Sequence, residues 1–476
     1  MSQGVLEAGN TFRKEQHYGS SQYNLFSTII SEPVLKKKVS PVRFIVLGFL
    51  IIIFLGSLLL SNSLTHNNGK EVNYVDALFT ATSATTVTGL VVVDTAETYN
   101  WFGQLVILAM IQLGGLGYMT ILSFFFIGGR IMPLRQAMFM KEQLNLPSIR
   151  DILELARRVF LTVAVFEIAG MAILASFWQN SFGFFKALWF GLFHSVSAFN
   201  NAGFDLMGGF KSFTDYATNP VINITIMALI VFGGLGFIVI SELVGLVRNT
   251  SKNGISLNAK LVLSTTLILI IAGSAFIYLF EKNNRDTIYP LSLGDGIIAS
   301  TFHSVSARTA GFNTLDIGKL TIPTLLIIIV LMFIGASPGG TGGGVKTTTF
   351  SIAVMSFFAF LKQKDEADAF NRKISADAVE KSFILICTSL LLVFFAVVII
   401  TSVEEIPLHK ILFEAFSAFG TVGLSTGITP QLNDVSKFVI MLLMYIGRLG
   451  PLTLISMITR SHKSKVAYLE EEVTIG

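Results

Sequence analysis

Long apolar stretches alternate with polar connections along almost the whole chain. Most of them approach the roughly 20 residues that a helix needs to cross a bilayer; they cover residues 44–60, 103–127, 159–177, 221–247, 260–280, 321–336, 345–361, 382–402 and 436–458. Four other apolar stretches are too short to span a membrane: Tyr74–Ala84, Lys186–Ala198, Asp295–Ala307 and His409–Ala418. The pattern predicts an all-α membrane protein.

Each short stretch runs into a phrase of small residues that ends at a glycine. The four glycines, Gly89, Gly203, Gly311 and Gly423, are 114, 108 and 112 residues apart. A fixed period indicates one structural unit used four times. We expect each short stretch to be a re-entrant helix that enters from outside and stops midway. Because exposed backbone is not tolerated in lipid, the glycine phrases must be buried in protein or line a water-filled cavity.

The glycine phrases have the composition of an ion filter. Four backbone loops around one axis build a potassium pore, since backbone carbonyls replace the hydration shell of the ion. Such carbonyls converge only if the chain takes positive φ at some positions, which glycine allows. We therefore predict a filter that prefers K⁺, with moderate discrimination, held by carbonyls near the four glycines. The predicted filter residues are Thr86, Val87, Thr88, Gly89, Asn201, Ala202, Gly203, Thr309, Ala310, Gly311, Thr421, Val422 and Gly423. Close helix packing is the alternative role of a single glycine, and the fixed period favours the filter.

The second helix of the third repeat is interrupted by a glycine-rich segment. Six glycines and a proline in the ten residues 335–344 cannot hold an α-helix. We predict that this segment lines a cavity below the filter and acts as a gate. Lys346 either tethers it or extends toward the cytoplasm. Arg448 lies in the last apolar stretch, where an unpaired guanidinium is costly; we favour a fixed charge that holds the gate over a structural pair. The predicted gating residues are Gly335, Pro338, Gly339, Gly340, Gly342, Gly343, Gly344, Lys346 and Arg448.

These features divide the chain into six parts. We predict a cytoplasmic arm, repeat 1, a linker helix with repeat 2, repeat 3 with the gating loop 335–349, a linker with repeat 4, and a cytoplasmic tail. Their expected bounds are 1–40, 41–130, 131–248, 249–361, 362–460 and 461–476.

Composition and charge agree with a membrane location. Hydrophobic residues make up 52% of the 476 residues and charged residues 13%, against about 25% charged in soluble domains. Basic residues gather in the arm, the tail and the loops near 130–158, 248–260 and 362–381. The positive-inside rule then places both termini in the cytoplasm. The opposite loops carry acidic residues that predict a cation-attracting vestibule: Asp94, Glu97, Asp205, Asp316, Glu404, Glu405 and Asp434.

Enzyme chemistry finds little support in the sequence. No HExxH or Walker A pattern is present. Glu167 and Glu242 are scattered intramembrane carboxylates without a visible partner, and we expect Arg308 to brace its loop rather than contact the ion. Cys387 is the single cysteine, so no disulfide forms within the chain, and we expect it to be a small buried hydrophobe.

Three segments resemble the Trk/Ktr/HKT superfamily of cation transporters, and most closely its KtrB-type potassium uptake subunits, NtpJ-like proteins included. They are His303–Phe312, Gly335–Thr349 and Gly447–Pro451, and the resemblance covers about residues 40 to 460. It implies four helix–pore-helix–helix units around a central, potassium-channel-like pore, with the four glycines in the filter. It also implies that segment 335–349 is an intramembrane gating loop and that Arg448 projects toward the pore and contacts this loop.

The resemblance further implies partners and a location. It implies a homodimer in the plasma membrane that sits on a cytosolic ring of RCK domains. These domains bind ATP or ADP and in some cases cyclic di-AMP. We expect this nucleotide control to come from a separate partner, with no cofactor on this chain, no nucleic acid bound, and Na⁺ as a stimulating ion. A Na⁺- or H⁺-coupled K⁺ symporter, a Na⁺-preferring pathway and, less favoured, a membrane enzyme are the alternatives.

Overall fold

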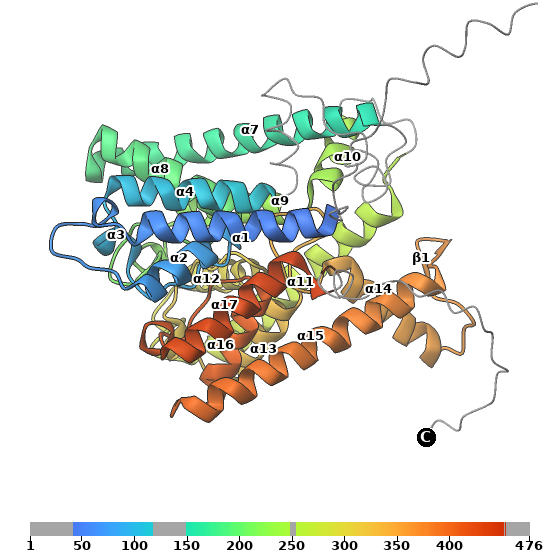
Figure 1. Cartoon of the computed structure of the whole chain (residues 1–476). Coiled ribbons are helices and arrows are strands. Elements are labelled where there is room, and N and C mark those ends of the chain that lie inside the picture. The colour runs from blue at the N-terminus through green and yellow to red at the C-terminus, as the bar shows by residue number, and fades with distance from the viewer. Residues whose placement is uncertain (1–40, 118–148, 248–253, 452, 454–476) are drawn as a thin grey trace, which may run out of the picture. The chain divides into compact units, whose positions relative to one another are not determined.

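The structure, a computed structural model, describes residues 41–117, 149–247, 254–451 and 453, and these are folded mainly into helices (Figure 1). The expected arm at 1–40, most of the linker helix before repeat 2 and the tail at 461–476 lie outside the described residues. The helices are α1 (Pro41–Leu60), α2 (Tyr74–Thr85), α3 (Thr95–Thr98), α4 (Trp101–Leu116), α7 (Ile149–Phe182), α8 (Phe184–Phe199), α9 (Pro220–Gly234), α10 (Phe237–Val247), α11 (Leu257–Glu281), α12 (Leu293–Ser306), α13 (Ile322–Phe333), α14 (Thr347–Leu361), α15 (Ala376–Val403), α16 (Leu408–Gly420) and α17 (Asp434–Leu449).

Side-chain caps mark where several helices begin. An asparagine side chain accepts a hydrogen bond from a first-turn backbone N–H at the starts of α2, α4, α9 and α17, at Asn73, Asn100, Asn219 and Asn433. Such a cap satisfies N–H groups that have no partner inside the helix, and its loss costs about 1 kcal/mol. The start of α13 at Thr321 has no side-chain cap hydrogen bond.

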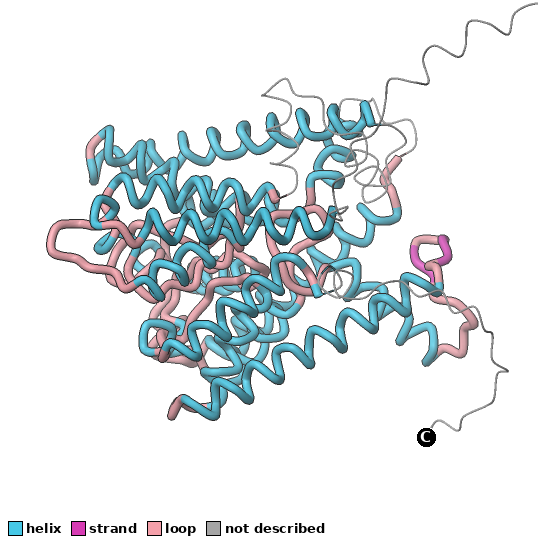
Figure 2. Tube along the Cα trace, viewed as in Figure 1, coloured by secondary structure: helices cyan, strands magenta, loops and turns pink. Residues whose placement is uncertain are grey.

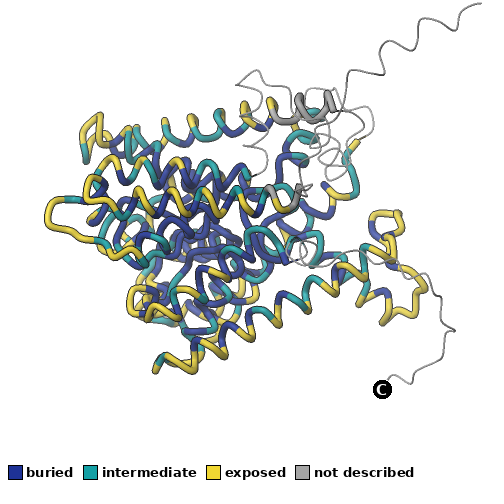
Figure 3. The backbone as a smooth tube through the Cα atoms, viewed as in Figure 1, coloured by how far each residue is buried: buried dark blue, intermediate teal, exposed yellow. Residues whose placement is uncertain are grey.

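Among the described residues, three helices are long and apolar enough to cross a membrane: Arg157–Phe182, Leu257–Glu281 and Ala376–Val403. The pair α9 and α10 passes the same test as one broken span, with a bend of 102°. Several other apolar helices are shorter. Large apolar side chains are exposed on these helices, for example on α11 and α15. The buried residues gather in the interior (Figure 3). This distribution suits a surface that faces lipid.

The four short helices that precede the glycine phrases are α2, α8, α12 and α16. Each packs against the helix before it: α1, α7, α11 and α15, respectively. Each also packs against the second helix of the previous repeat, because α4 contacts α8, α9 contacts α12, α13 contacts α16, and α17 contacts α2. The last contact joins the end of the described chain to its beginning, so the helices form a closed cycle. Non-helical segments run through the middle of this bundle as well as at its ends (Figure 2).

The structure differs from the sequence prediction in three places. The apolar stretch 221–247 is not one helix, because the backbone breaks at Gly236, which has φ +91°. The following N–H, of Phe237, donates to the Gly339 carbonyl of the glycine-rich loop. The linker 362–381 contains a short hairpin of β1 (Asp368–Ala369) and β2 (Arg372–Lys373), paired antiparallel with Asp368 opposite Lys373. The prediction that Cys387 is buried is wrong, because its side chain is exposed on α15.

Candidate functional site

The four glycine phrases share one backbone turn after the short helix. In each, the residue before the glycine donates its N–H to the carbonyl of the serine that begins the phrase. The bonds are Thr88 to Ser83 at 2.8 Å, Ala202 to Ser197 at 2.8 Å, Ala310 to Ser306 at 2.9 Å, and Val422 to Ser417 at 2.8 Å. The serine side chains add to the turn, because the Gly89 and Gly423 N–H groups donate to Ser83 and Ser417 Oγ.

Positive φ recurs at two positions in every phrase. The glycines have φ of +89°, +68°, +80° and +92° in chain order. The residues two positions earlier are also left-handed, although they carry side chains: Val87, Asn201, Thr309 and Thr421, with φ between 51° and 84°. Left-handed backbone costs roughly 1–2 kcal/mol for such residues. The sequence contained no signal for this second position, because valine and threonine disfavour it.

The four glycines lie against one another in a closed ring. A Cβ added to Gly89 would lie 2.5 Å from the Ala202 carbonyl oxygen, one added to Gly203 would lie 2.8 Å from that of Ala310, and one added to Gly311 would lie 2.5 Å from that of Val422. A Cβ on Gly423 would collide with the Thr88 carbonyl oxygen, which closes the cycle. Each glycine therefore faces the carbonyl that precedes the glycine of the next strand, and no side chain fits at these positions.

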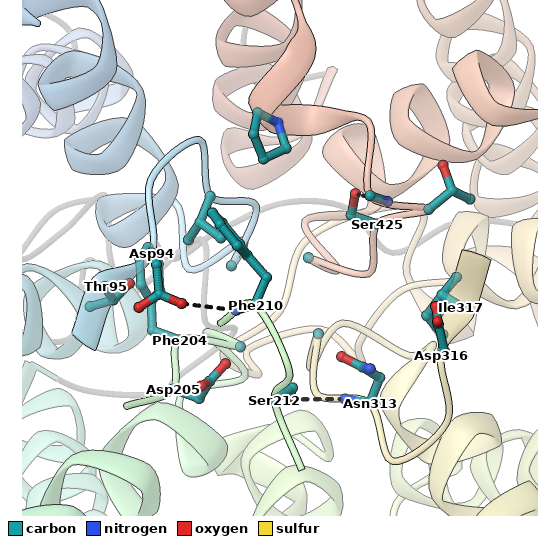
Figure 4. Close-up of a pocket in the computed structure, with 18 residues that line it drawn as sticks. Asp94, Thr95, Phe204, Asp205, Phe210, Ser212, Asn313, Asp316, Ile317 and Ser425 are labelled. Atoms are coloured by element: carbon teal, nitrogen blue, oxygen red, sulfur yellow. Dashed lines mark hydrogen bonds between the residues drawn. The ribbon is translucent and has the colours of Figure 1, made fainter. Parts of the chain in front are cut away.

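A cavity of about 250 Å³ opens on one side of the ring, and all four glycines line it. Residues from all four repeats surround it (Figure 4). Three of them are acidic: Asp94, Asp205 and Asp316. The Asp94 carboxylate is already engaged, because it accepts from the N–H groups of Glu97 and Phe210, both at 2.9 Å. Burial raises the pKa of Asp205 to about 7, and the nearby negative charge of Asp94 raises it as well.

The glycine-rich loop between α13 and α14 lies against the ring. The Gly343 N–H donates to Thr421 Oγ1 at 2.8 Å, and a Cβ on Gly342 would collide with Thr309 Oγ1. Backbone hydrogen bonds hold the loop from two further sides, from Ser337 N–H to Gly234 O at 3.0 Å and from Gly344 N–H to Gly447 O at 3.2 Å.

Two cationic side chains bind backbone oxygens at this loop. The Arg448 guanidinium donates to the carbonyls of Thr341, in the loop, and of Gly114 and Gly115, at the end of α4. Lys346 Nζ donates to the Gly342 carbonyl at 2.7 Å. Lys346 was expected either to tether the glycine-rich loop or to extend toward the cytoplasm, and in the structure it contacts the loop.

Polar groups behind the ring were not recognised as partners in the sequence. Asn200 Nδ2 donates to Glu167 Oε1 at 3.0 Å and to Gln112 Oε1 at 2.8 Å, so Glu167 does have partners. Arg308 donates to the Thr266 carbonyl at 3.5 Å and to its hydroxyl at 3.3 Å. These contacts join residues that are 33 to 88 positions apart in the chain, which is why neighbouring residues gave no sign of them.

Comparison with known proteins places the chain in a family. A family model described as "cation transport protein", TrkH, matches residues 48–467. The chain belongs to this family. The protein is therefore a cation transporter, and the membrane-enzyme alternative is rejected. The apolar outward faces of its helices agree with the membrane location of a transporter.

Individual members of the TrkH family cover almost the whole chain. The Ktr system potassium uptake protein B of Bacillus subtilis is 38% identical over 452 residues, which are 94% of this chain and 100% of that protein. The potassium/sodium uptake protein NtpJ of Enterococcus hirae is 37% identical over 94% of this chain and 100% of its own length. The crystal structure of the potassium transporter TrkH from Vibrio parahaemolyticus has a TM-score of 0.70 at 17% identity, and the match covers 89% of this chain and 85% of that one. The fold is thus that of TrkH.

Proposed function

We propose that this TrkH-family protein takes potassium ions up across the plasma membrane through the ring of four glycine segments. The observation that supports this proposal most directly is the ring itself. In it, each glycine packs on the carbonyl that precedes the glycine of the next strand. Backbone carbonyls arranged around one axis replace the hydration shell of K⁺. The Bacillus relative is named as a potassium uptake protein and the Enterococcus relative as a potassium/sodium uptake protein. The inside-negative membrane potential supplies the driving force, about 2.3 kcal/mol per charge at 100 mV.

In this proposal the ring is the selectivity filter and the cavity beside it is the outer vestibule. The half-buried Asp205 carboxylate gathers cations at the entrance. The glycine-rich loop, on which Arg448 and Lys346 converge, is the gate. Both termini are cytoplasmic, as the distribution of basic residues implies.

Flux into vesicles of reconstituted protein tests the proposal. Uptake of K⁺ and of Na⁺ is measured separately under an imposed inside-negative potential, with protein-free vesicles as the control. We expect K⁺ to enter faster than Na⁺. The absence of cation flux from correctly folded protein would overturn the proposal. Faster Na⁺ uptake would favour the second candidate, a Na⁺-preferring pathway, which the name of the Enterococcus relative makes worth testing. A dependence of K⁺ uptake on a Na⁺ or H⁺ gradient would instead indicate symport.

We also propose that the protein acts as a homodimer on a cytosolic ring of RCK domains, which binds ATP, ADP or cyclic di-AMP, and that Na⁺ stimulates uptake. The resemblance to KtrB-type subunits supports this assembly. Light scattering of the purified protein in detergent checks the dimer. We expect a protein mass of about twice the 51.9 kDa of the chain, and a monomer at all concentrations would contradict it.

A further inference from the structure

The residue two positions before each ring glycine is completely buried and left-handed. These residues are Val87, Asn201, Thr309 and Thr421, each 0% exposed. Val87 takes this conformation without a side-chain hydroxyl, at φ 51°, the same value as Thr421. The hydroxyl of Thr421 is therefore not needed for the turn of its own strand, and its role lies in a contact outside that strand.

The Thr421 hydroxyl meets the glycine-rich loop. Its Oγ1 accepts the Gly343 N–H at 2.8 Å, and the bond is buried. A Cβ on Gly343 would lie 2.6 Å from the same oxygen, so the backbone of the loop touches the threonine directly. Separating the two groups without water would leave a buried N–H unsatisfied, which is unfavourable. The contact therefore favours the loop in its present position.

This contact differs from the other anchors of the loop. Ser337 and Gly344 donate to carbonyls of α9 and α17, and Arg448 binds the Thr341 carbonyl from α17. Those bonds join the loop to the surrounding helices. The bond to Thr421 joins the loop to a strand of the ring itself, two residues before Gly423.

We propose that Thr421 is a positioning residue that couples the glycine-rich loop to the fourth strand of the ring, so that loop and strand change conformation together. The inference rests on the proposed function of the loop as the gate. When the loop leaves the pathway, the Gly343 N–H and the Thr421 hydroxyl separate, and the strand loses the contact that braces it. Because coupling between two sites is reciprocal, a change in the strand that weakens the bond also releases the loop.

Thiol labelling of the loop tests this coupling. Cys387 is the single cysteine, so Cys387→Ser gives a cysteine-free chain. Pro338→Cys then places one thiol on the half-exposed turn of the loop. A membrane-impermeant maleimide is added to the proposed cytoplasmic face of membrane vesicles that contain the full chain. Its reaction rate reports how often the loop is accessible. Potassium flux is measured on the same proteins.

Three variants are compared in this background. Thr421→Val removes the acceptor but keeps the branched shape that the first strand already has at Val87. Thr421→Ser keeps the hydroxyl. Ser389→Ala is the distant control, because Ser389 Oγ donates only within α15, to the Leu385 carbonyl at 2.7 Å.

We expect Thr421→Val to raise both the labelling rate and the K⁺ flux about fivefold, the effect of one hydrogen bond on an equilibrium. Ser389→Ala should stay close to the parent, and Thr421→Ser, which keeps the acceptor, should label more slowly than Thr421→Val. A labelling rate unchanged by Thr421→Val would overturn the inference, even if ion preference changed, because Thr421 would then act within the ring alone. If Thr421→Val does not fold, Thr421→Ala removes the same acceptor and is read in the same way. Failure of the proposed function is distinguishable, since the parent itself would then carry no potassium.

Discussion

At the scale of the residue, backbone conformation defines the site more than side-chain chemistry does. The four ring glycines combine positive φ with a neighbouring carbonyl where a Cβ would stand. The residues two positions earlier also have a left-handed backbone, although their side chains are those of valine, asparagine and threonine. Such strain persists only where the surrounding structure over-determines it. Complete burial of these residues supplies that constraint.

Replacing Gly423 tests the ring at one position. In Gly423→Ala the added Cβ meets the Thr88 carbonyl oxygen at φ +92°, so the fourth strand must shift away from the axis. We expect the preference for K⁺ over Na⁺ in vesicle flux to fall on the order of tenfold, which corresponds to ~1.4 kcal/mol. Gly69→Ala is the matched control, because Gly69 has φ +79° but open space around it. An unchanged ion preference in Gly423→Ala would contradict the filter assignment.

Asp205 makes the vestibule sensitive to pH. Its pKa is raised to about 7, chiefly by burial, so the carboxyl is neutral below that pH and gains its negative charge as the pH rises through it. We expect K⁺ uptake from dilute external potassium to increase between external pH 6 and 8, by a few fold. In Asp205→Asn the K⁺ uptake rate should stay at the parent's low-pH value over this range. Asp215→Asn, at an exposed site, should keep the parent's pH dependence. The same pH profile in Asp205→Asn and the parent would refute the prediction.

At the scale of the element, the glycine-rich loop is held by several partners that come from different repeats. Its backbone bonds to α9 and α17, to the hydroxyl of Thr421 and to the Arg448 guanidinium. The same guanidinium binds carbonyls at the end of α4. An irregular segment within the membrane needs such partners for its backbone polar groups. The loop is thus a docked element, whose position depends on how many of these bonds survive.

Loss of the Arg448 guanidinium should release the loop. Arg448→Gln removes charge-assisted bonds to Thr341 in the loop and to Gly114 and Gly115, each worth about 1.5–3 kcal/mol. We expect basal K⁺ flux into vesicles to rise about tenfold or more. Arg308→Gln serves as the comparison, because that buried guanidinium hydrogen-bonds Thr266 instead of the loop, and it should bring no rise. A fall in flux for folded Arg448→Gln would show that the loop does not obstruct the pathway.

At the scale of the whole molecule, glycines on the second helices let each repeat pack closely behind its own strand of the ring. A Cβ on Gly114, Gly233 or Gly447 would collide with a carbonyl in the last turn of a short helix or directly after it. The carbonyls belong to Thr85, Phe199 and Phe419, each four residues before a ring glycine. Small residues allow this close approach of helices in a membrane. The sequence interpretation of Gly114 and Gly233 as packing residues agrees with these contacts.

Stability should depend on this close approach. In Gly447→Ala the new Cβ meets the backbone of Phe419, so α17 must move away from α16. Overpacking of this kind costs about 1–3 kcal/mol, and we expect the thermal unfolding midpoint in detergent to fall by about 3 °C or more. Gly48→Ala is the control, since Gly48 lies in α1 with open space around it. Equal midpoints for the two variants would show that the contact is not needed for stability.

Apart from the contact of Arg448 with the glycine-rich loop, which the family resemblance implied, contacts between repeats were beyond the reach of sequence analysis. The hydrogen bonds from Phe237 to Gly339, from Asn200 to Gln112 and from Gly343 to Thr421 all join residues of different repeats. Periodicity reports only which residues are near in the chain, whereas these contacts depend on how four units are placed around one centre. The misjudged burial of Cys387 has the same origin, because an apolar position on a membrane helix can face either protein or lipid.

The sequence by itself determined the four-fold repetition, the helical class and the four glycines, because hydrophobic length and the conformational freedom of glycine are local properties. It also singled out the glycine-rich interruption, since six glycines and a proline exclude a helix wherever they stand. Only the tertiary structure decided that each glycine meets the carbonyl of the next strand and that the Thr421 hydroxyl meets the loop. Those contacts depend on the order in which the repeats pack, and that order is a property of the whole bundle.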